Sequence, residues 1–468
     1  MSTPALTKPT RSVAATQPDI GWAPLLVVLA GTFVTFLDFF IVNVALPSIH
    51  TELHAGPSAM SLVVAGYGLT FAVGMITGGR LGDLYGRRRM FVLGLVLFTL
   101  TSAACGLAPT ATTLVVARIL QGAAGALLTP QVLAILGTTY TGARRGTAFA
   151  AYGFAMGIAG VLGQLVGGAL IQADVAGLGW RAIFLINVPI GVIAVPLARR
   201  RVPESHGAQA RLDIVGTLVG SVALTALVLP LVEGREHGWP LWTWLCFAAV
   251  PVLGIVFVAQ QNGRARAGLA PLVDPGLFRS RSFAVGSLVG MMFTLVPPSF
   301  FFVLALYLQQ GRGYPALFSG EVFAAVGVGY FAAMLVATPL AERLGHQVLA
   351  LGSVLVAAGC VALVEVAHAS SALDLVPGLA LVGFGIGAVL VPLSSMVLAG
   401  IDPQHAGSAS GVLSTAQQVG GALGVAITGA VFFGSGAVVP AFTSCLWVLV
   451  GLAAATAVLA QLLRTPRR

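Results

Sequence analysis

The sequence predicts an all-α protein that crosses a membrane many times. Three observations predict this class: 57% of the 468 residues are hydrophobic, only 8% are charged, and long apolar runs recur along the whole chain. A soluble protein cannot cover that much apolar surface with polar side chains. In hydrocarbon a helix satisfies its backbone hydrogen bonds internally, so the recurring apolar runs favour a bundle of membrane-spanning helices.

Fourteen apolar runs are long enough to cross a bilayer, which takes about 20 residues in a helix. An even number of spans places both chain termini on the same side of the membrane. The expected spans cover residues 23–47, 60–78, 90–108, 112–136, 147–171, 182–198, 214–232, 241–260, 283–308, 316–340, 347–367, 375–400, 409–433 and 441–463.

The distribution of basic residues orients these spans. Of the 24 lysines and arginines, twenty lie on one side of the expected bundle, three lie on the other side, and Arg118 lies inside a span. Short loops rich in lysine and arginine stay in the cytoplasm. We therefore expect a multi-pass protein of the cell (inner) membrane with both termini in the cytoplasm. The net charge of +9 then reflects topology and does not indicate a nucleic-acid partner.

Composition also excludes several classes of function. Lys8 is the only lysine in the chain, and a phosphate-binding loop of the ATPase type needs a lysine, so an ATP-driven pump is excluded. No catalytic constellation stands out, and we do not expect an enzyme. His50 and His54 flank Glu52, but no third ligand is evident beside them, so we expect no metal site.

The most charged loop lies between the second and third spans, at residues 79–89. Its four arginines cannot lie in hydrocarbon, so this is a short cytoplasmic loop. Its glycines allow a tight turn and close approach of the backbone. Asp83 has Arg87 four residues later, so an ion pair can form and break at the mouth of this helix pair.

The two halves of the chain repeat a pattern. Residues 339–346 follow the tenth span as residues 80–87 follow the second, with a leucine, a small residue, an acid and a glycine at the same spacing. Duplicated halves that bind substrate near the bilayer midplane are typical of transporters. We expect a cytoplasmic tail at 1–22, a six-helix bundle at 23–200, two linker helices at 201–282, a second six-helix bundle at 283–463 and a cytoplasmic tail at 464–468.

Two opposite charges fall inside predicted spans of the first bundle. Asp38 lies about nine residues from the outer end of its span and Arg118 about six residues into the fourth span, which places them about 13 and 9 Å deep. A long arginine side chain can bridge that difference. A charge within the bilayer costs free energy, so we expect a functional pair in which Asp38 exchanges protons. A static structural ion pair is also compatible with this placement.

The second bundle contains two further candidate features. Glu321 lies in the outer half of the tenth span, where it could bind a cationic substrate or a proton, or could be hydrated at the interface. Pro297 and Pro298 interrupt the ninth span, and the carbonyls they free are tolerated only beside a cavity or neighbouring helices. The phenylalanines around them could line an apolar cavity or face lipid. They are Phe293, Phe300, Phe301 and Phe302.

Several motifs together resemble the major facilitator superfamily. The signature loop G-x-L-G-D-x-x-G-R-R-R of that family matches residues 79–89. Fourteen spans, the pattern R-x-x-Q-G from Arg118 to Gly122 and the sequence of residues 37–47 resemble its fourteen-helix drug:proton antiporter branch. The resemblance implies a major facilitator fold. It also implies a conformational latch on the cytoplasmic side, formed by Gly79, Asp83, Gly86, Arg87 and Arg88.

The antiporter motif of the fifth span departs from the family pattern at one position. The family has G-P-x-x-G-G, and this chain has glutamine, Gln164, in place of the proline. We therefore expect a weaker kink and a polar amide within a stripe of small residues suited to close helix contact. The glycines of this antiporter helix remain, namely Gly160, Gly163, Gly167 and Gly168.

The resemblance implies an antiporter that exports hydrophobic or cationic drugs or antibiotics by alternating access, with the proton gradient as energy source and no cofactor. Its partners would be a small-molecule substrate, protons and the lipid bilayer, with no obligate protein partner. A proton-coupled transporter of one small metabolite, by uptake symport or export, is an alternative that more polar cavity helices would favour. A non-transporting membrane receptor or scaffold is a remote alternative, because it would not need the pair of Asp38 and Arg118.

Overall fold

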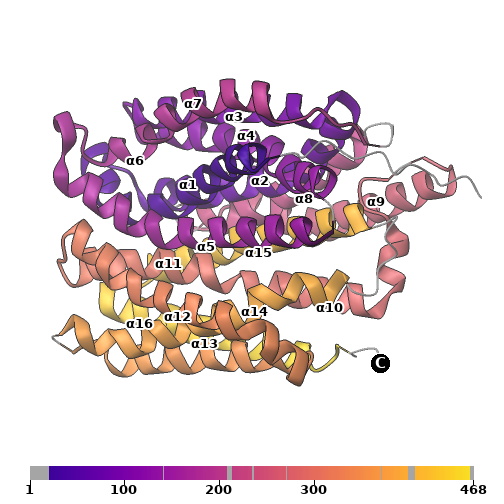
Figure 1. Ribbon diagram of the computed structural model, residues 1–468. Coiled ribbons are helices and arrows are strands. Elements are labelled where there is room, and N and C mark those ends of the chain that lie inside the picture. The colour runs from indigo at the N-terminus through magenta and orange to yellow at the C-terminus, as the bar shows by residue number, and fades with distance from the viewer. Residues whose placement is uncertain are drawn as a thin grey trace, which may run out of the picture.

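The computed structural model describes residues 21–140, 142–207, 213–234, 237–269, 271–369, 371–398 and 406–463. The regular structure of these residues is helical, with no strand in the part of the chain described. Thirteen helical segments within it are long and apolar enough to cross a membrane. The predicted fold class is confirmed: this is an all-α protein that passes through the membrane many times (Figure 1).

The first half of the chain forms one group of packed helices. Helix α4 packs against both α2 and α3, and α1 packs along α5. The group consists of α1 (Ala23–Leu53), α2 (Pro57–Tyr85), α3 (Arg87–Gly106), α4 (Ala111–Thr139), α5 (Gly142–Ala173), the short turns η1 (Val175–Gly177) and η2 (Gly179–Arg181), α6 (Ala182–Leu185) and α7 (Asn187–Arg201).

The last part of the chain forms a second group, in which α14 packs against α12 and α13. It consists of α10 (Arg281–Thr294), α11 (Val296–Leu306), η4 (Tyr307–Gly311), α12 (Ala316–Leu344), α13 (Gln347–Glu365), η5 (Ala372–Leu375), α14 (Val376–Leu398), α15 (Ala406–Phe432) and α16 (Val438–Ala460). Figure 1 shows the two groups as an indigo-to-magenta layer and an orange-to-yellow layer.

Two helices lie between these groups in the sequence, and a short turn, η3 (Pro275–Arg279), follows them. Helix α8 (Ile214–Glu233) pairs with α9 (Leu241–Arg266), and α8 also packs against α2 and α15. Only 6% of the residues in the most apolar segment of α9 are buried, as expected for a peripheral helix that faces lipid. The exact boundaries expected for the bundles and linker stay a prediction.

The ends of the helices differ from the expected spans at several places. Helix α1 continues through Pro47 to Leu53, so the span predicted to end at residue 47 was too short and Asp38 lies at the midpoint of the helix. The ninth span is divided, with α10 ending at Thr294 and Pro297 in the first turn of α11. Proline fits there because the first N–H groups of a helix have no helical acceptor.

The predicted thirteenth span corresponds to α15, which is long enough at 27 residues but is not among the thirteen apolar segments of the described chain. Gln417, Gln418 and many small residues lower its hydropathy. Its neighbours explain how so polar a helix is accommodated. Helix α15 packs against α2, α10 and α8, so other helices cover it and reduce its contact with lipid.

The two groups meet along two seams, where α5 packs on α12 and α2 packs on α15. At the first seam a Cβ on Gly168 would lie 2.5 Å from the carbonyl oxygen of Ala316, and one on Gly320 would lie 2.6 Å from that of Gln164. Backbones can approach this closely only where side chains are absent. The small-residue stripe expected on α5 therefore contacts α12 directly.

Candidate functional site

A fully buried ion pair joins α1 to α4. The Arg118 Nη1 atom lies 2.5 Å from Asp38 Oδ2, and neither side chain has any exposed surface. Asp38 is fifteen residues from either end of α1, whereas Arg118 lies in the second turn of α4. The long arginine side chain bridges this difference, as the sequence predicted. The structure brings the two residues together; their role in proton exchange stays a prediction.

Three polar side chains complete the surroundings of the Asp38 carboxylate. Gln121 Nε2 and Asn187 Nδ2 each donate to Asp38 Oδ1 at 2.9 Å. The hydroxyl of Ser102 accepts from these same amides, at 3.0 Å from Gln121 and 2.8 Å from Asn187. Ser102 in turn donates to the carbonyl of Phe184 at 3.0 Å. The carboxylate is therefore held by donors from α4 and α7, with α3 behind them.

Arg118 is held independently of Asp38. Its Nε donates to the carbonyl of Val63 at 3.0 Å and its Nη1 also donates to Gln121 Oε1 at 2.8 Å. The guanidinium lies over the ring of Tyr67, 4.2 Å from the centroid, and 5.6 Å from that of Phe184. A cation over an aromatic face is stabilised when water is excluded. The positive charge can therefore stay in place when the charge of Asp38 changes.

The hydrogen bonds around Asp38 favour its ionised form. An ionised carboxylate only accepts hydrogen bonds, and here both of its oxygens accept. Protonation would turn one oxygen into a donor and would weaken its contact with Arg118. One nitrogen of that arginine, Nη2, has no hydrogen-bond partner, and neither has Asn187 Oδ1. Such unpaired buried groups are costly and are common at functional sites. The site therefore contains one donor and one acceptor that are available for other hydrogen bonds.

Sequence reasoning did not include Gln121, Asn187 or Ser102 among the site residues. One signal was available for Gln121, which follows Arg118 by three residues and so shares its helix face. An amide within an apolar span was a second signal, for Gln121 and Asn187 alike. Ser102 offered no comparable signal, because serine is common in membrane helices.

A chain of aromatic rings leads from the ion pair to the second group of helices. Tyr67, which covers Arg118, lies 5.9 Å from Phe39, and Phe39 lies 5.2 Å from Phe40 between ring centroids. Phe40 meets Phe301 of α11 edge to face at 5.3 Å. The ion pair and the divided helix are thus linked by contacting side chains.

The two prolines and their phenylalanines belong to the protein interior. Phe293, Phe300 and Phe302 are fully buried, so the lipid-facing alternative is wrong for these three. Phe301 stacks on Phe323 of α12, with ring centroids 5.6 Å apart. Pro298 faces α15, because a Cβ on Gly421 would lie 3.3 Å from its ring. Whether Pro297 and Pro298 border a substrate cavity stays a prediction.

The antiporter helix α5 packs directly on the part of α1 that carries Asp38. A Cβ on Gly163 would lie 3.2 Å from the carbonyl of Leu37, and one on Gly167 would lie 2.7 Å from Ile41. A Cβ on Gly160 would lie 3.4 Å from the ring of Phe40. The glycines of this motif therefore set how closely α5 approaches α1.

Gln164, which replaces the proline of the motif, is fully buried. Its Nε2 donates to the backbone carbonyl of Phe40 at 2.7 Å, whereas its Oε1 has no partner. The amide thus bonds α5 to α1, and α5 continues as one helix through this position, from Gly142 to Ala173. The weaker kink expected without the proline agrees with this uninterrupted helix.

The predicted latch contains the expected ion pair. Arg87 Nη2 lies 2.9 Å from Asp83 Oδ1. The backbone of the same loop pairs with the segment after α7, because Arg87 N donates to Ser205 O at 2.9 Å and Gly207 N donates to Asp83 O at 3.1 Å. These partners belong to the first group and the segment that follows it. A latch between the two halves therefore stays a prediction.

The glycines of the latch satisfy specific geometric needs. Gly86 has φ = +103°, a conformation that side chains disfavour, and a Cβ there would lie 2.8 Å from the carboxylate of Glu204. Glu204 accepts from Arg88 N at 2.9 Å and so caps the start of α3. A Cβ on Gly79 would lie 3.5 Å from the side chain of Pro130 in α4.

Glu321, the second candidate carboxylate, is exposed on α12. It takes part in none of the hydrogen bonds around Asp38 given above. Its role towards a cationic substrate or a proton stays a prediction.

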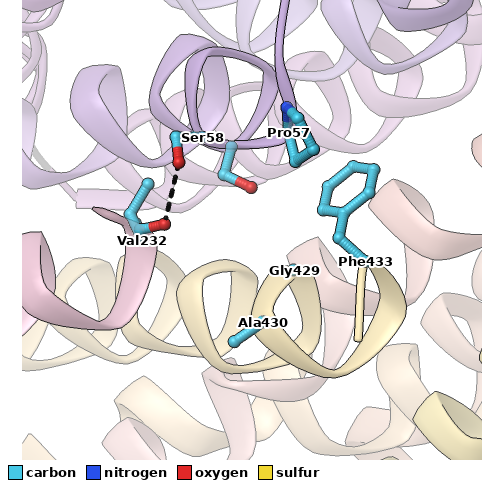
Figure 2. A pocket seen from close by; sticks show the side chains of 7 residues that line it. Pro57, Ser58, Val232, Gly429, Ala430 and Phe433 are labelled. Atoms are coloured by element: carbon cyan, nitrogen blue, oxygen red, sulfur yellow. Dashed lines mark hydrogen bonds between the residues drawn. The ribbon is translucent and has the colours of Figure 1, made fainter. Parts of the chain in front are cut away.

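A small pocket of about 220 Å³ lies where α2, α8 and α15 meet. Figure 2 shows Pro57 and Ser58 facing Gly429, Ala430 and Phe433 across it. Ser58 Oγ donates to the carbonyl of Val232 at 3.2 Å, which ties α8 to α2 beside the pocket. The volume is below the range of about 300 to 1,000 Å³ typical of drug-sized ligands. This pocket therefore lies where the seam between α2 and α15 meets the linker helix α8.

A buried ion pair in the middle of a many-helix membrane bundle, beside a seam between two halves, defines the class of polytopic membrane transport proteins. The chain belongs to the Major Facilitator Superfamily, whose sequence profile matches residues 28–425. The family expected from the motifs is thereby confirmed.

Several named proteins are similar to this chain over most of its length. A probable actinorhodin transporter of Streptomyces coelicolor is 38% identical, over 88% of this chain and 72% of its own. The puromycin resistance protein pur8 of Streptomyces alboniger is 35% identical, over 91% of this chain and 85% of its own. The cephamycin export protein CmcT of Amycolatopsis lactamdurans is 33% identical, over 84% and 82%.

Solved structures of distant sequence share the fold. A POT family transporter crystallised with 5-aminolevulinic acid aligns with a TM-score of 0.71 at 15% identity, over 96% of this chain and 99% of its own. A D-xylose-proton symporter aligns with a TM-score of 0.65 at 15% identity, over 94% and 97%. At these identities the likeness shows the major facilitator fold alone.

Proposed function

We propose that this protein exports hydrophobic or cationic drugs or antibiotics in exchange for protons. One observation carries the proposal: the buried pair of Asp38 and Arg118, with 0% exposure of both side chains, in a chain whose relatives are named for antibiotic transport or resistance. A charge pair in the bilayer is costly and typically marks an ion or proton pathway.

Asp38 is the proposed proton site. A proton on this carboxylate cancels its charge, and Arg118 then keeps only its neutral acceptors, Val63 O and Gln121 Oε1. The loss of the ion pair weakens the attachment of α1 to α4, which then depends on the hydrogen bond from Gln121 to Asp38. Because the motif glycines of α5 contact α1 around Asp38, movement of α1 is transmitted to α5. A shift of α5 along α12 would change the seam between the two halves, as alternating access requires.

The proposed substrates follow from the side chains at this seam. Phe39, Phe40, Phe301 and Phe323 present aromatic surface where α1 meets α11 and α12. Aromatic surface suits hydrophobic compounds, and its faces attract cations. The exposed carboxylate of Glu321 would add a second attraction for a cationic compound. These features support hydrophobic or cationic substrates.

The orientation proposed is the one that the arginines predict. The end of the bundle that carries Asp83 faces the cytoplasm, together with both chain termini, in the cell membrane. Export then requires the substrate to be taken up at the Asp83 end and released at the end that carries Trp180. The proton moves in the opposite direction.

Proton release on substrate addition tests this function. Purified protein in weakly buffered detergent should release protons when a transported compound is added. In an antiporter the substrate and the proton bind alternately, so binding of the substrate displaces the proton. Asp38→Asn should abolish this release, whereas Asp38→Glu should retain part of it with a shifted pH optimum. Asp374→Asn, which removes an exposed carboxylate at η5, is the matched control. Equal release by wild type and Asp38→Asn would remove Asp38 as the coupling site.

A further inference from the structure

A basic pocket lies at the predicted cytoplasmic end of the first group of helices. It measures about 380 Å³ and lies between the start of α3 and the end of α7, which pack against each other. Three arginines and three aliphatic residues line it: Arg88, Arg89, Arg199, Val92, Leu93 and Val96. The proposed transport cycle assigns no role to this pocket.

The charge of the pocket is only partly balanced. Glu204 is the carboxylate beside it, with its Oε2 atom 3.5 Å from Arg88 Nε and 3.9 Å from Arg89 Nε. Its Oε1 atom accepts instead from the backbone N–H of Arg88. Glu204 thus lies near two of the three guanidinium groups of the pocket, those of Arg88 and Arg89. The Arg89 side chain is 72% exposed and Arg199 is exposed as well, so both are free to reach an outside anion.

The pocket continues from the charged end of α3 into its apolar part. From Arg88 to Val96 the helix rises about 12 Å. Leu93 belongs to a membrane-spanning segment and is 43% exposed, so its side chain is accessible to an acyl chain. A ligand that fits this wall must be anionic at one end and apolar at the other. A phospholipid has this form, and basic pockets between membrane helices are known to suit anionic head groups.

We propose that this pocket binds an anionic phospholipid, with its phosphate between Arg89 and Arg199 and an acyl chain along Val92, Leu93 and Val96. The lipid would supply the negative charge that Glu204 alone does not. It would also hold the end of α7 against the start of α3, beside the loop that carries Asp83. This inference depends on the membrane position of the helices and is independent of the direction of transport.

Lipid titration of the purified full chain in detergent tests the proposal. Phosphatidylglycerol should raise the melting temperature, and phosphatidylcholine with the same acyl chains should raise it much less. Inorganic phosphate and glycerol 3-phosphate, which lack acyl chains, should have no effect at the same concentrations. The double variant Arg89→Gln/Arg199→Gln should bind phosphatidylglycerol about 30-fold more weakly, as expected for two lost cations near an anionic head group.

The matched control removes two other exposed arginines predicted on the same side, as Arg266→Gln/Arg343→Gln. This control should bind phosphatidylglycerol as the wild type does. A loss of affinity equal to that of the pocket variant would mean that lipid responds only to net charge, and the pocket would be refuted. An equal shift with phosphatidylcholine would refute the anionic head group, and an equal shift with inorganic phosphate would refute the lipid. Leu93→Asn tests the apolar wall separately, since it should weaken lipid binding while leaving every arginine in place.

Discussion

The side-chain amide of Gln164 on α5 donates a 2.7 Å hydrogen bond to the backbone carbonyl of Phe40 on α1. Phe40 follows Asp38 by two residues, and its ring contacts Phe301 of the second group of helices. A Cβ on Gly320 of α12 would lie 2.6 Å from the backbone carbonyl oxygen of Gln164. The residue that replaces the motif proline therefore connects three helices beside the proposed proton site.

Gln164→Leu tests whether this connection seals the protein. Leucine keeps the volume but removes the donor. Phe40 O also accepts from Asn43 Nδ2 at 3.0 Å, so we expect a modest loss of stability, about 1 kcal/mol. Proton leak in proteoliposomes should increase, because α1 is less firmly held against α5. Gln347→Leu, which breaks an exposed contact with Gln461, is the control. A tight, unchanged membrane seal in Gln164→Leu would contradict this role.

Gly168→Ala tests the close approach of α5 to α12. The added methyl group would lie 2.5 Å from the carbonyl of Ala316, so the helices must separate. We expect a loss of about 1 to 3 kcal/mol, as overpacking typically costs, and slower export. Gly153→Ala on the same helix is a stringent control, because a Cβ there meets nothing within 4 Å. It should melt and transport as the wild type does. If both variants behave alike, the seam does not limit the cycle.

Asp83→Asn tests the latch. In this conformation the carboxylate pairs with Arg87, and the two side chains are 26% and 15% exposed. A partly exposed ion pair near the membrane surface contributes at most about 1 kcal/mol, so expression and melting temperature should change little. Export should nevertheless slow strongly, because the predicted latch uses this carboxylate to stabilise the state that is closed on the cytoplasmic side. Transport is measured in everted vesicles, with Asp374→Asn as control. Full export by a well-expressed Asp83→Asn protein would contradict the predicted role of Asp83 as a latch.

The pairing of Asp38 with Arg118 could be predicted because depth along two helices depends only on residue spacing. The division of the ninth span at Pro297 and Pro298 could be predicted because proline has no N–H to donate. The continuation of α1 beyond Pro47 could not, since a proline near a predicted boundary is equally compatible with the end of a helix. The sequence therefore predicted which helices and contacts form better than it predicted where the helices end.

The rest of the site depends on how separate helices are rotated against each other. Ser102 reaches Gln121 and Asn187 only because α3, α4 and α7 present these faces to one centre. The contact of Phe40 with Phe301 joins residues more than 250 positions apart. Periodicity of apolar residues does not specify such rotations in a membrane span, where nearly every face is apolar.

Asp213 makes the linker helices sensitive to acid. It lies just before α8, where it accepts from Gly216 N at 2.9 Å and from Gln261 Nε2 at 2.7 Å, with Arg264 Nε at 3.4 Å. Burial raises the pKa of Asp213, but the hydrogen bonds from Gly216, Gln261 and Gln260 and the charge of Arg264 outweigh it, so the pKa lies below its usual value.

The sign of the pH effect follows from this depressed pKa. The ionised carboxylate stabilises the fold above the unfolded value, about pH 4, and the stabilisation is lost as the pH falls towards the lower folded pKa. Asp213→Asn should therefore lower the melting temperature at pH 7. The difference between variant and wild type should shrink below about pH 4. Thermal unfolding in detergent across this range measures it, and a constant difference at every pH would contradict the assignment.

Arg118 and Tyr67 permit the sharpest test of the ion pair. The guanidinium uses Nε for Val63 O and Nη1 for Asp38 and Gln121, and its central carbon lies 4.2 Å from the centre of the Tyr67 ring. Lysine keeps the charge but has one nitrogen, so it cannot donate along both directions or stack in the same way.

Arg118→Lys should therefore fold less stably and lose at least about tenfold in export, the equivalent of about 1.4 kcal/mol, although the net charge is unchanged. Tyr67→Phe keeps the ring beneath the cation and loses only a long hydrogen bond, 3.4 Å, to Thr35 O, so it should transport nearly as the wild type does. Tyr67→Leu removes the aromatic face and should fall between them, since a desolvated cation–π contact contributes about 2 kcal/mol. Initial export rates and melting temperatures of the three variants measure the order. Wild-type export by Arg118→Lys would show that any positive charge suffices, and the geometry of the pair would then have no part in coupling.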